Sequence, residues 1–204
     1  MAGLQPLRSR RGPTIRESAR MTVTPDLNER DLGLVRRFQA GDDRAFDELV
    51  QAHRREIYRL AYRLLGNHAD ADDLAQEAFL RVYRSLARFR RESSFRTWLT
   101  RIVLNLAADR RSERSAMRQV SLEEVQPGEM GVEMGSAAPG FPFAERAVQR
   151  AVGLLPPRQR ETLILRIFQG MKFQEIATVM GCTVSTAKAN FFHALKGLRE
   201  RVRV

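Results

Sequence analysis

The apolar residues of this chain recur every three or four positions over two long stretches, from Asp31 to Arg111 and from Phe143 to the C-terminus. Side chains at this spacing share one face of an α-helix. Neither stretch contains the alternation of apolar and polar residues that marks a half-buried strand. We therefore expect an all-α fold whose cores form between packed helices.

The helical spacing is lost between residues 113 and 144, where glycine and proline are frequent. Such a composition is typical of a linker. We therefore predict two small helical domains, over residues 31–112 and 145–204, joined by a flexible linker over residues 113–144. Residues 1–30 lack the apolar segment of a secretory signal, and we expect them to form a disordered basic tail. Whether Met1 or Met21 is the true start stays open at this point.

Basic residues are concentrated in two blocks of the chain. The net charge is +11, from 35 Lys and Arg against 24 Asp and Glu. Residues 81–112 hold nine basic and two acidic residues, and residues 145–204 hold eleven and four. The segment between these blocks, residues 113–144, is slightly acidic. Two separate cationic blocks suit two contacts with one long polyanion, which predicts a nucleic acid as the partner.

Several classes of protein are disfavoured by what the sequence lacks. A single cysteine, Cys182, excludes an internal disulfide and a zinc site built from several thiolates. The three histidines are scattered, and neither a glycine-rich phosphate loop nor a nucleophile motif is present. We therefore expect a non-enzymatic protein without a cofactor or metal. Cys182 is interpreted as a small buried apolar residue rather than a redox-responsive thiol.

The stretch from Phe173 to Leu198 has the form of a helix-turn-helix. Ala177 permits a close helix crossing, Gly181 suits a turn with positive φ, and Thr183 is a good N-cap. On the second helix we expect an inward stripe of Val184, Ala187, Phe191, Leu195, Leu198 and Val202. The residues expected to face DNA are Ser185, Thr186, Lys188, Ala189, Asn190, Phe192, His193 and Lys196. A helical hairpin with a solvated basic face is the alternative, in which Phe192 packs against a partner or the preceding domain.

Acidic residues crowd the start of another predicted helix, at Asp70, Asp72, Asp73 and Glu77. The positive end of the helix dipole favours acids there. A docking surface for a basic partner and a metal site are the other interpretations. The metal site is the least favoured, because no Glu-x-x-His pair accompanies the acids.

Three motifs together resemble the extracytoplasmic-function (ECF) sigma factors of bacterial RNA polymerase. They are DADDLAQEAFLRVYRSLARF, FRTWLTRIVLNLAADRR and LPPRQRETLILRIFQGMKFQEIATVMG. The resemblance runs from about Asp31 to Leu198. It implies two helical domains, sigma domain 2 and sigma domain 4. The first would bind the polymerase clamp and the −10 promoter element, and the second the −35 element and the polymerase flap.

The resemblance also implies roles for individual residues. Those matching the helix that docks on core polymerase are Asp73, Gln76, Glu77 and Arg81. Those matching the −10-reading region are Arg96, Trp98, Arg101, Asn105, Asp109, Arg110 and Arg111. Additional phosphate contacts are expected from Arg88, Arg90 and Arg91. Trp98 has an alternative interpretation as a core aromatic, because it shares a stripe with Phe95, Ile102 and Leu106.

The recognition helix departs from the family pattern, because two arginines common there are absent. Asn190 and His193 can still bond to bases, with a different preference, so the usual −35 sequence is in doubt rather than the DNA binding. The resemblance further implies promoter melting, a cytoplasmic location and an anti-sigma partner, which could hold the protein at the inner membrane. A dimeric two-domain regulator that binds DNA without polymerase is the rival interpretation.

Overall fold

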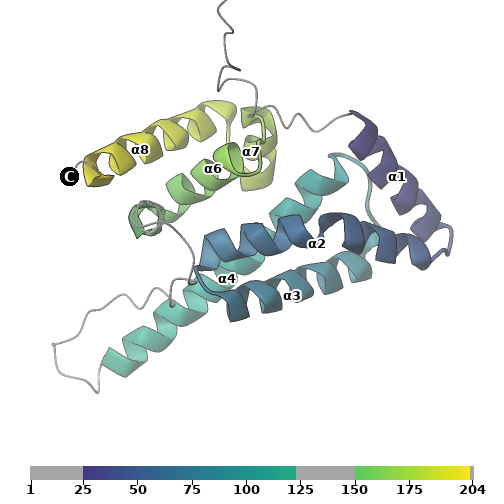
Figure 1. The fold of residues 1–204 in the computed structure, drawn as a ribbon, viewed down its shortest axis with the longest axis horizontal. Helices are drawn as coiled ribbons and strands as arrows, with labels where there is room; N and C mark the ends of the chain where they lie inside the picture. Colours follow the sequence, from purple (N-terminus) through teal and green to yellow (C-terminus); the bar gives the residue numbers. More distant parts are fainter. Residues whose placement is uncertain (1–24, 123–149, 203–204) are drawn as a thin grey trace, which may run out of the picture.

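The computed structural model describes residues 25–122 and 150–202, and every regular element in these ranges is an α-helix (Figure 1). The expected all-α fold is confirmed. The N-terminal helices are α1 (Pro25–Gln39), α2 (Arg44–Leu65), α3 (His68–Leu86) and α4 (Phe95–Leu122). The C-terminal helices are α6 (Pro157–Ile167), α7 (Phe173–Met180) and α8 (Val184–Val202). Helix α4 continues into the segment that the sequence analysis assigned to the linker. Helix α1 begins at Pro25, so residues 25–30 are helical and the expected disordered tail is wrong for them. Residues 1–24 and most of the expected linker lie outside the described residues.

The N-terminal helices pack around one apolar core. Helix α2 lies against α1 and α3, and α4 closes the other side of α2 and α3. The large side chains that are completely buried there are Leu49, Ile57, Leu60, Leu74, Leu86, Phe95, Leu99 and Leu106. Burial of such side chains is the main stabilising contribution to a helical bundle, at about 1.5–3 kcal/mol each.

The buried face of α4 differs in part from the expected stripe. Phe95 and Leu106 are buried as expected, but Trp98 and Ile102 are only half-buried. Leu99 and Val103 are completely buried in their place. The helix packs against α2 and α3 on one side and α7 on the other, so the spacing alone did not identify which apolar residues are covered.

The C-terminal helices form the expected helix-turn-helix. Gly181 has φ +62°, the left-handed conformation that favours glycine, and Thr183 Oγ1 accepts from Thr186 N at 3.1 Å as a cap of α8. Ala177 is buried against α8. The inward stripe of α8 is corrected at Leu195, which is 44% exposed, while Ala194 is completely buried. Ala194 packs with Leu155 and Leu163. The side chain of Val202 lies outside the described residues.

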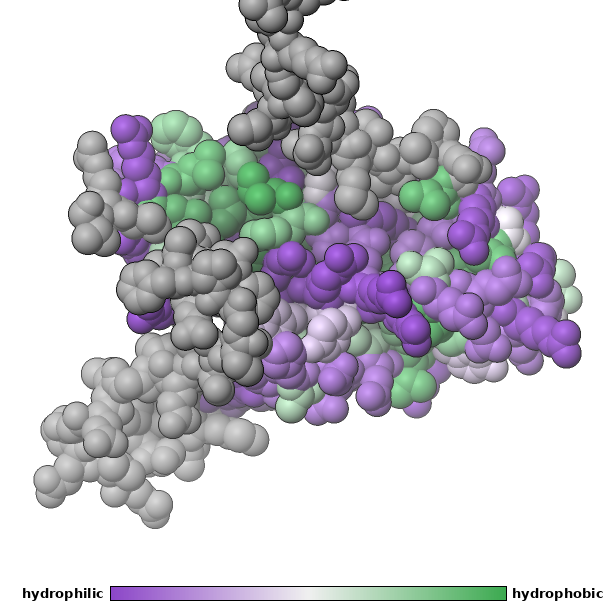
Figure 2. Space-filling view, in the orientation of Figure 1, coloured by the Kyte–Doolittle hydropathy of each residue, from purple (hydrophilic) through white to green (hydrophobic). Residues whose placement is uncertain are grey.

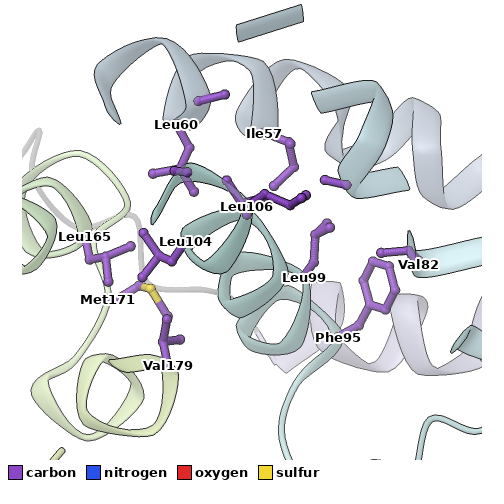
Figure 3. Close-up of a cluster of buried hydrophobic side chains, with 14 of the residues drawn as sticks. Ile57, Leu60, Val82, Phe95, Leu99, Leu104, Leu106, Leu165, Met171 and Val179 are labelled. Atoms are coloured by element: carbon purple, nitrogen blue, oxygen red, sulfur yellow. The ribbon is translucent and has the colours of Figure 1, made fainter. Parts of the chain in front are cut away.

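The two groups of helices share part of their core. Buried residues of α2 and α4 belong to one contiguous apolar cluster with residues of α6, α7 and the turn between them. Figure 3 shows Leu104 of α4 pointing toward Leu165, Met171 and Val179. Leu104 is 5% exposed. In the part of the chain that the structure describes, the N-terminal and C-terminal helices therefore pack against one another.

None of the described helices has the length and apolar composition required to cross a membrane.

Candidate nucleic-acid interface

Helix α8 presents a polar face to solvent. Of the eight residues expected to face DNA, Asn190 is half-buried and the other seven are exposed. Phe192 is 65% exposed, with its ring 5.9 Å from that of His193. An apolar ring exposed to this extent among polar side chains is available for a thymine methyl or a sugar.

Helix α8 is held in place by contacts with α7, which is itself held by α6. The Phe173 ring of α7 meets the Phe191 ring of α8 edge to face at 5.7 Å, and the Arg166 guanidinium lies 4.9 Å from the centre of the Phe173 ring. Arg158 Nη1 donates to the Met180 carbonyl at 3.1 Å, which holds the end of α7. These contacts join α7 to α8 and to α6.

Apolar side chains also reach the surface near α8. Figure 2 shows a green area over the end of the molecule where α8 lies in Figure 1. Phe192, Leu195 and Leu154 are the large exposed apolar residues of this region. Sequence analysis expected Leu195 to face inward, because it fits the apolar spacing of α8, and it did not single out Leu154.

The seven residues expected at the −10 element all lie on α4, but the structure places them in different surroundings. Arg101, Asn105 and Asp109 are exposed. Arg96 and Arg111 are half-buried; Arg96 contacts Gln169 in the turn between α6 and α7, and Arg111 contacts Glu161 of α6. Arg110 donates to the Asp70 carbonyl at 3.3 Å and lies 3.4 Å from Glu77 Oε2. These seven residues therefore do not form a single free face of α4.

Trp98 is part of an aromatic group at the start of α4. Its ring lies 4.8 Å from that of Phe89 and 6.0 Å from that of Phe95. Phe95 is completely buried, whereas Trp98 is half-buried. The tryptophan thus supports the core on one side and is accessible on the other.

The loop between α3 and α4 carries the exposed residues Arg88, Arg90 and Arg91. Arg91 has φ +61°, which is unusual for a residue with a side chain. Gln39 of α1 holds this loop, since its Nε2 donates to the Phe89 carbonyl at 3.1 Å and to the Leu86 carbonyl at 3.2 Å. Nothing in the local sequence around Gln39 pointed to this contact.

The residues expected to dock on polymerase lie on α3. Asp73, Gln76 and Arg81 are exposed, while Glu77 is half-buried. Glu77 forms an ion pair with Arg81 at 2.9 Å on the same helix. Leu80, 55% exposed, lies one turn after Gln76, and a hollow of about 370 Å³ beside Gln76 is lined by Tyr58, Phe79 and others. Sequence analysis did not single out Leu80 or this hollow.

The acids at the start of α3 have different local partners. Asn67 caps the helix by accepting from Asp70 N at 2.7 Å, and Asp70 forms an ion pair with Arg114 of α4. Asp72 and Asp73 are exposed. Within residues 25–122 and 150–202, no three His, Cys, Asp or Glu side chains converge as metal ligands. Asp70 therefore serves the local packing of α3 and α4.

A buried charged network lies beneath the start of α4. His53 Nε2 lies 2.9 Å from Asp31 Oδ2, and Arg96 Nε donates to Glu56 Oε1 at 2.7 Å. Burial opposes the charged imidazolium, but hydrogen bonds to Asp31 and Glu56 outweigh it and raise the pKa of His53 to about 9. Burial likewise opposes ionisation of Glu56, yet His53 and Arg96 lower its pKa. His53 is therefore a structural cation.

Cys182 lies in the turn before α8, half-buried against the shared apolar cluster. Its interpretation as an apolar packing residue stays a prediction.

Known proteins resemble the chain over most of its length. It matches Sigma-70 region 2 over residues 49–116 and Sigma-70, region 4 over residues 145–198. The RNA polymerase sigma-H factor of Pseudomonas aeruginosa is 36% identical over 178 residues, which are 83% of this chain and 92% of that protein. The ECF RNA polymerase sigma-E factor of Escherichia coli K12 is 32% identical over 181 residues, 85% of this chain and 94% of that protein.

Two solved structures have a similar fold. The sigma factor RpoE of Bartonella quintana, crystallised with the anti-sigma factor NepR, has a TM-score of 0.63 at 23% identity and covers 78% of this chain and 97% of its own. CnrH, in complex with the cytosolic domain of CnrY, has a TM-score of 0.63 at 26% identity and covers 84% of this chain and 96% of its own.

Proposed function

Because this chain belongs to the ECF sigma factors, the non-catalytic subunits that direct RNA polymerase to promoters, we propose that α4 and α8 contact the two promoter elements. In this proposal residues 31–112 form sigma domain 2, residues 113–144 the linker, and residues 145–204 sigma domain 4. The supporting observation is that two separate basic blocks each carry exposed polar side chains, on one face of α8 and at Arg101, Asn105 and Asp109 of α4.

Domain 4 reads the −35 element as duplex DNA. The polar side chains of Ser185, Thr186, Asn190 and His193 lie where a recognition helix meets base edges. Lys188 and Lys196 are exposed cations that suit phosphates, which fix the register without reading sequence. Ala189 leaves space for close approach of the helix to the groove, and Phe192 supplies the apolar contact.

Domain 2 holds the melted −10 strand. Taking a base out of the stack costs a few kcal/mol, and stacking on aromatic side chains with cationic contacts offsets this cost. On α4, the exposed Arg101 supplies a cation about one helical turn from Trp98, and the exposed Asn105 supplies an amide about two turns from it. Asp109 accepts a hydrogen bond from a base amino group, and the remaining arginines, Arg96, Arg110 and Arg111, attract phosphates.

Helix α3 docks domain 2 on core polymerase. Asp73 and Gln76 are exposed and offer a carboxylate and an amide to a basic partner, and Arg81 extends this polar row. Leu80 adds apolar area beside them. Glu77 contributes through its ion pairs, which fix Arg81 and Arg110. Polar contacts around a small apolar centre are typical of a specific interface.

The activity is controlled by an anti-sigma factor in this proposal. The support is that the similar sigma factor RpoE of Bartonella quintana was crystallised with the anti-sigma factor NepR. The protein works in the cytoplasm with RNA polymerase, and a membrane-linked anti-sigma factor would hold it at the inner membrane. Fractionation of cells with and without the partner gene tests this location.

Run-off transcription with purified core polymerase tests the main function. Promoters are first selected by sequencing the genomic DNA that the reconstituted holoenzyme protects. We expect transcripts from these promoters only when the protein is present, and a monomer in solution. Equal transcription with core polymerase alone would contradict the proposal. A stable dimer that binds the same promoters without polymerase would favour the rival two-domain regulator.

A further inference from the structure

We propose that a cleft lined by α4, α6 and α7 binds a mononucleotide, a small phosphorylated anion distinct from promoter DNA. The cleft has a volume of about 440 Å³, and small-molecule sites usually have about 300–1,000 Å³. Its polar lining residues are Arg101, Asn105, Arg111, Arg158 and Glu161. Helix α6 supplies Arg158 and Glu161, neither of which has a proposed role at the promoter, and the site requires no contact with DNA.

Positive charge is in excess in this cleft. Three guanidinium groups line it, those of Arg101, Arg111 and Arg158, and the carboxylate of Glu161 is the one acidic group among the lining residues. Three cations against one carboxylate leave a surplus of two positive charges. The phosphate of a monoester carries a charge of about −1.5 to −2 at pH 7. A phosphate group of this kind therefore balances the charge of the cleft.

Contacts within the protein hold these guanidinium groups in place without using all of their donors. Arg158 Nη1 donates to the Met180 carbonyl at 3.1 Å. Arg101 Nη2 donates to a backbone carbonyl of α7, and Arg111 Nη2 pairs with Glu161. A guanidinium has five N–H donors, so each group keeps donors that an anion can use. Arg101 and Arg158 are exposed, which makes their donors accessible.

The protein around Arg111 is short of acceptors as well as of negative charge. Arg111 Nη1 and Arg160 Nε are buried and have no hydrogen-bond partner in the part of the chain that the structure describes. Burial and the charge of Arg111 lower the pKa of Arg160, against the opposing effect of Glu161. Uncompensated positive charge of this kind attracts an anion to the neighbouring cleft.

Apolar side chains complete the lining. Leu104 of α4 points toward Val179 of α7 (Figure 3), and both line the cleft together with Met180. Each of the three is 5% exposed. Inorganic phosphate would leave this apolar part uncovered, whereas the base and sugar of a nucleotide cover it. Apolar walls with a few placed polar groups are typical of small-molecule sites, so a mononucleotide suits the lining better than a bare anion.

Calorimetric titration of the full chain with AMP tests this site, with adenosine and inorganic phosphate titrated for comparison. Ala108 is an exposed lining residue of α4 without a proposed role. The variant A108E places a carboxylate in the cleft. The matched control A116E makes the same change of residue and net charge at an exposed position of α4 outside the lining. Thermal unfolding is measured for both variants.

We expect AMP to bind the wild type about tenfold or more tightly than adenosine or inorganic phosphate does, because only AMP uses both parts of the cleft. A108E should weaken AMP binding by about tenfold or more, since a like charge within a few ångströms opposes the phosphate. A116E should match the wild type. Absence of AMP binding, equal binding of AMP and either comparison ligand, or an unchanged affinity in A108E would each overturn the site.

A short single-stranded oligonucleotide distinguishes a free nucleotide from the backbone phosphates of DNA. We expect A108E to weaken binding of AMP more than binding of the oligonucleotide. An oligonucleotide that binds the wild type more tightly than AMP and loses as much affinity in A108E would assign the cleft to DNA and overturn a separate nucleotide site. Failure of AMP to bind would leave the −10 assignment, which promoter opening tests, unaffected.

If A108E does not fold, R158Q serves instead, with R199Q at an exposed position of α8 as its control. R158Q should weaken AMP binding by about tenfold, because one charge-assisted hydrogen bond to the phosphate is lost. R199Q should bind AMP as the wild type does. Equal AMP affinities of R158Q and R199Q would overturn the site.

Discussion

The side-chain amide of Gln39 donates to the carbonyl of Phe89, fifty positions further along the chain, at 3.1 Å. Helix α1 thereby fixes the loop that carries Arg88, Arg90 and Arg91. This relationship makes Gln39 a positioning residue for a cationic loop beside Trp98, although Gln39 itself has no proposed contact with DNA.

Gln39→Ala should therefore lower the rate of open-complex formation several-fold, because each lost hydrogen bond contributes about 1 kcal/mol to the loop's position. Gln51→Ala, at an exposed position of α2, is the control. Potassium permanganate footprinting of the melted bases measures the rate. A template opened beforehand by mismatches should restore transcription by Gln39→Ala, and persistent loss on that template would contradict a role in melting.

Asn105→Ala should impair promoter opening while leaving polymerase binding intact. The side chain is exposed on α4 and belongs to neither apolar core, so the fold should tolerate its loss. Discrimination by one amide against a base is worth about 1–3 kcal/mol, which predicts a loss of roughly tenfold or more. Glu113→Ala, further along the exposed part of α4, should behave as wild type. Loss of core binding by Asn105→Ala would refute the assignment.

Asp73→Lys should weaken assembly with core polymerase, because reversing a charge at a complementary surface costs affinity. Glu77→Lys should do so too, but it also breaks ion pairs with Arg81 and Arg110, so its thermal stability must be measured alongside. Asp47→Lys on the exposed part of α2 is the control. Competition for core polymerase against a labelled sigma factor gives the affinities. Normal assembly by Asp73→Lys would mean that this acid only complements the helix dipole.

The stability of the protein should depend on pH through His53. Its pKa is about 9 in the folded state against an ordinary value of 6.5, so its stabilising contribution is complete below about pH 6.5 and is lost as the pH rises through 9. The free energy of unfolding, measured with urea near pH 6.5 and near pH 9, should fall by roughly 1–3 kcal/mol in the wild type. The variant His53→Gln should not show this fall. His193→Gln on the exposed face of α8 should keep the wild-type slope. Identical slopes for His53→Gln and wild type would exclude a buried charged His53.

Two residues of α8 should differ in how they affect DNA binding. Lys196→Ala should weaken binding equally on all sequences and lower the slope of log affinity against log salt by about one, since one phosphate contact is lost. Asn190→Ala should instead relax the preference at one base pair of the −35 element. Holoenzyme binding to a panel of −35 variants at several salt concentrations separates the two effects. A salt slope that does not change in Lys196→Ala would contradict its phosphate role.

The local elements followed from the sequence because their causes are local. Thr183 caps α8 through Thr186 N, and Ser94 accepts from Thr97 N at 3.1 Å at the start of α4. Gly66 and Gly181 end their helices with positive φ. Each of these contacts joins residues within a few positions of one another, so the residue types and their spacing were sufficient.

The candidate site was predictable only in part. Exposure of Asn105 and of most of the α8 face agreed with helical spacing. The exposure of Leu195 did not, because spacing identifies an apolar face without saying how far a neighbouring helix covers it. At that edge the small Ala194 takes the buried position against Leu155 and Leu163.

By itself, the sequence determined the helices, the turns and the basic blocks of this sigma factor, since these depend on neighbours along the chain. Only the tertiary structure decided that His53 meets Asp31, that Gln39 holds the loop after α3, and that Arg96 contacts Gln169. Long polar side chains can reach partners in many directions, and which one they find depends on how the helices pack. That packing is set by buried apolar area, such as that of Leu104 against Val179, which periodicity cannot assign to a particular pair of helices.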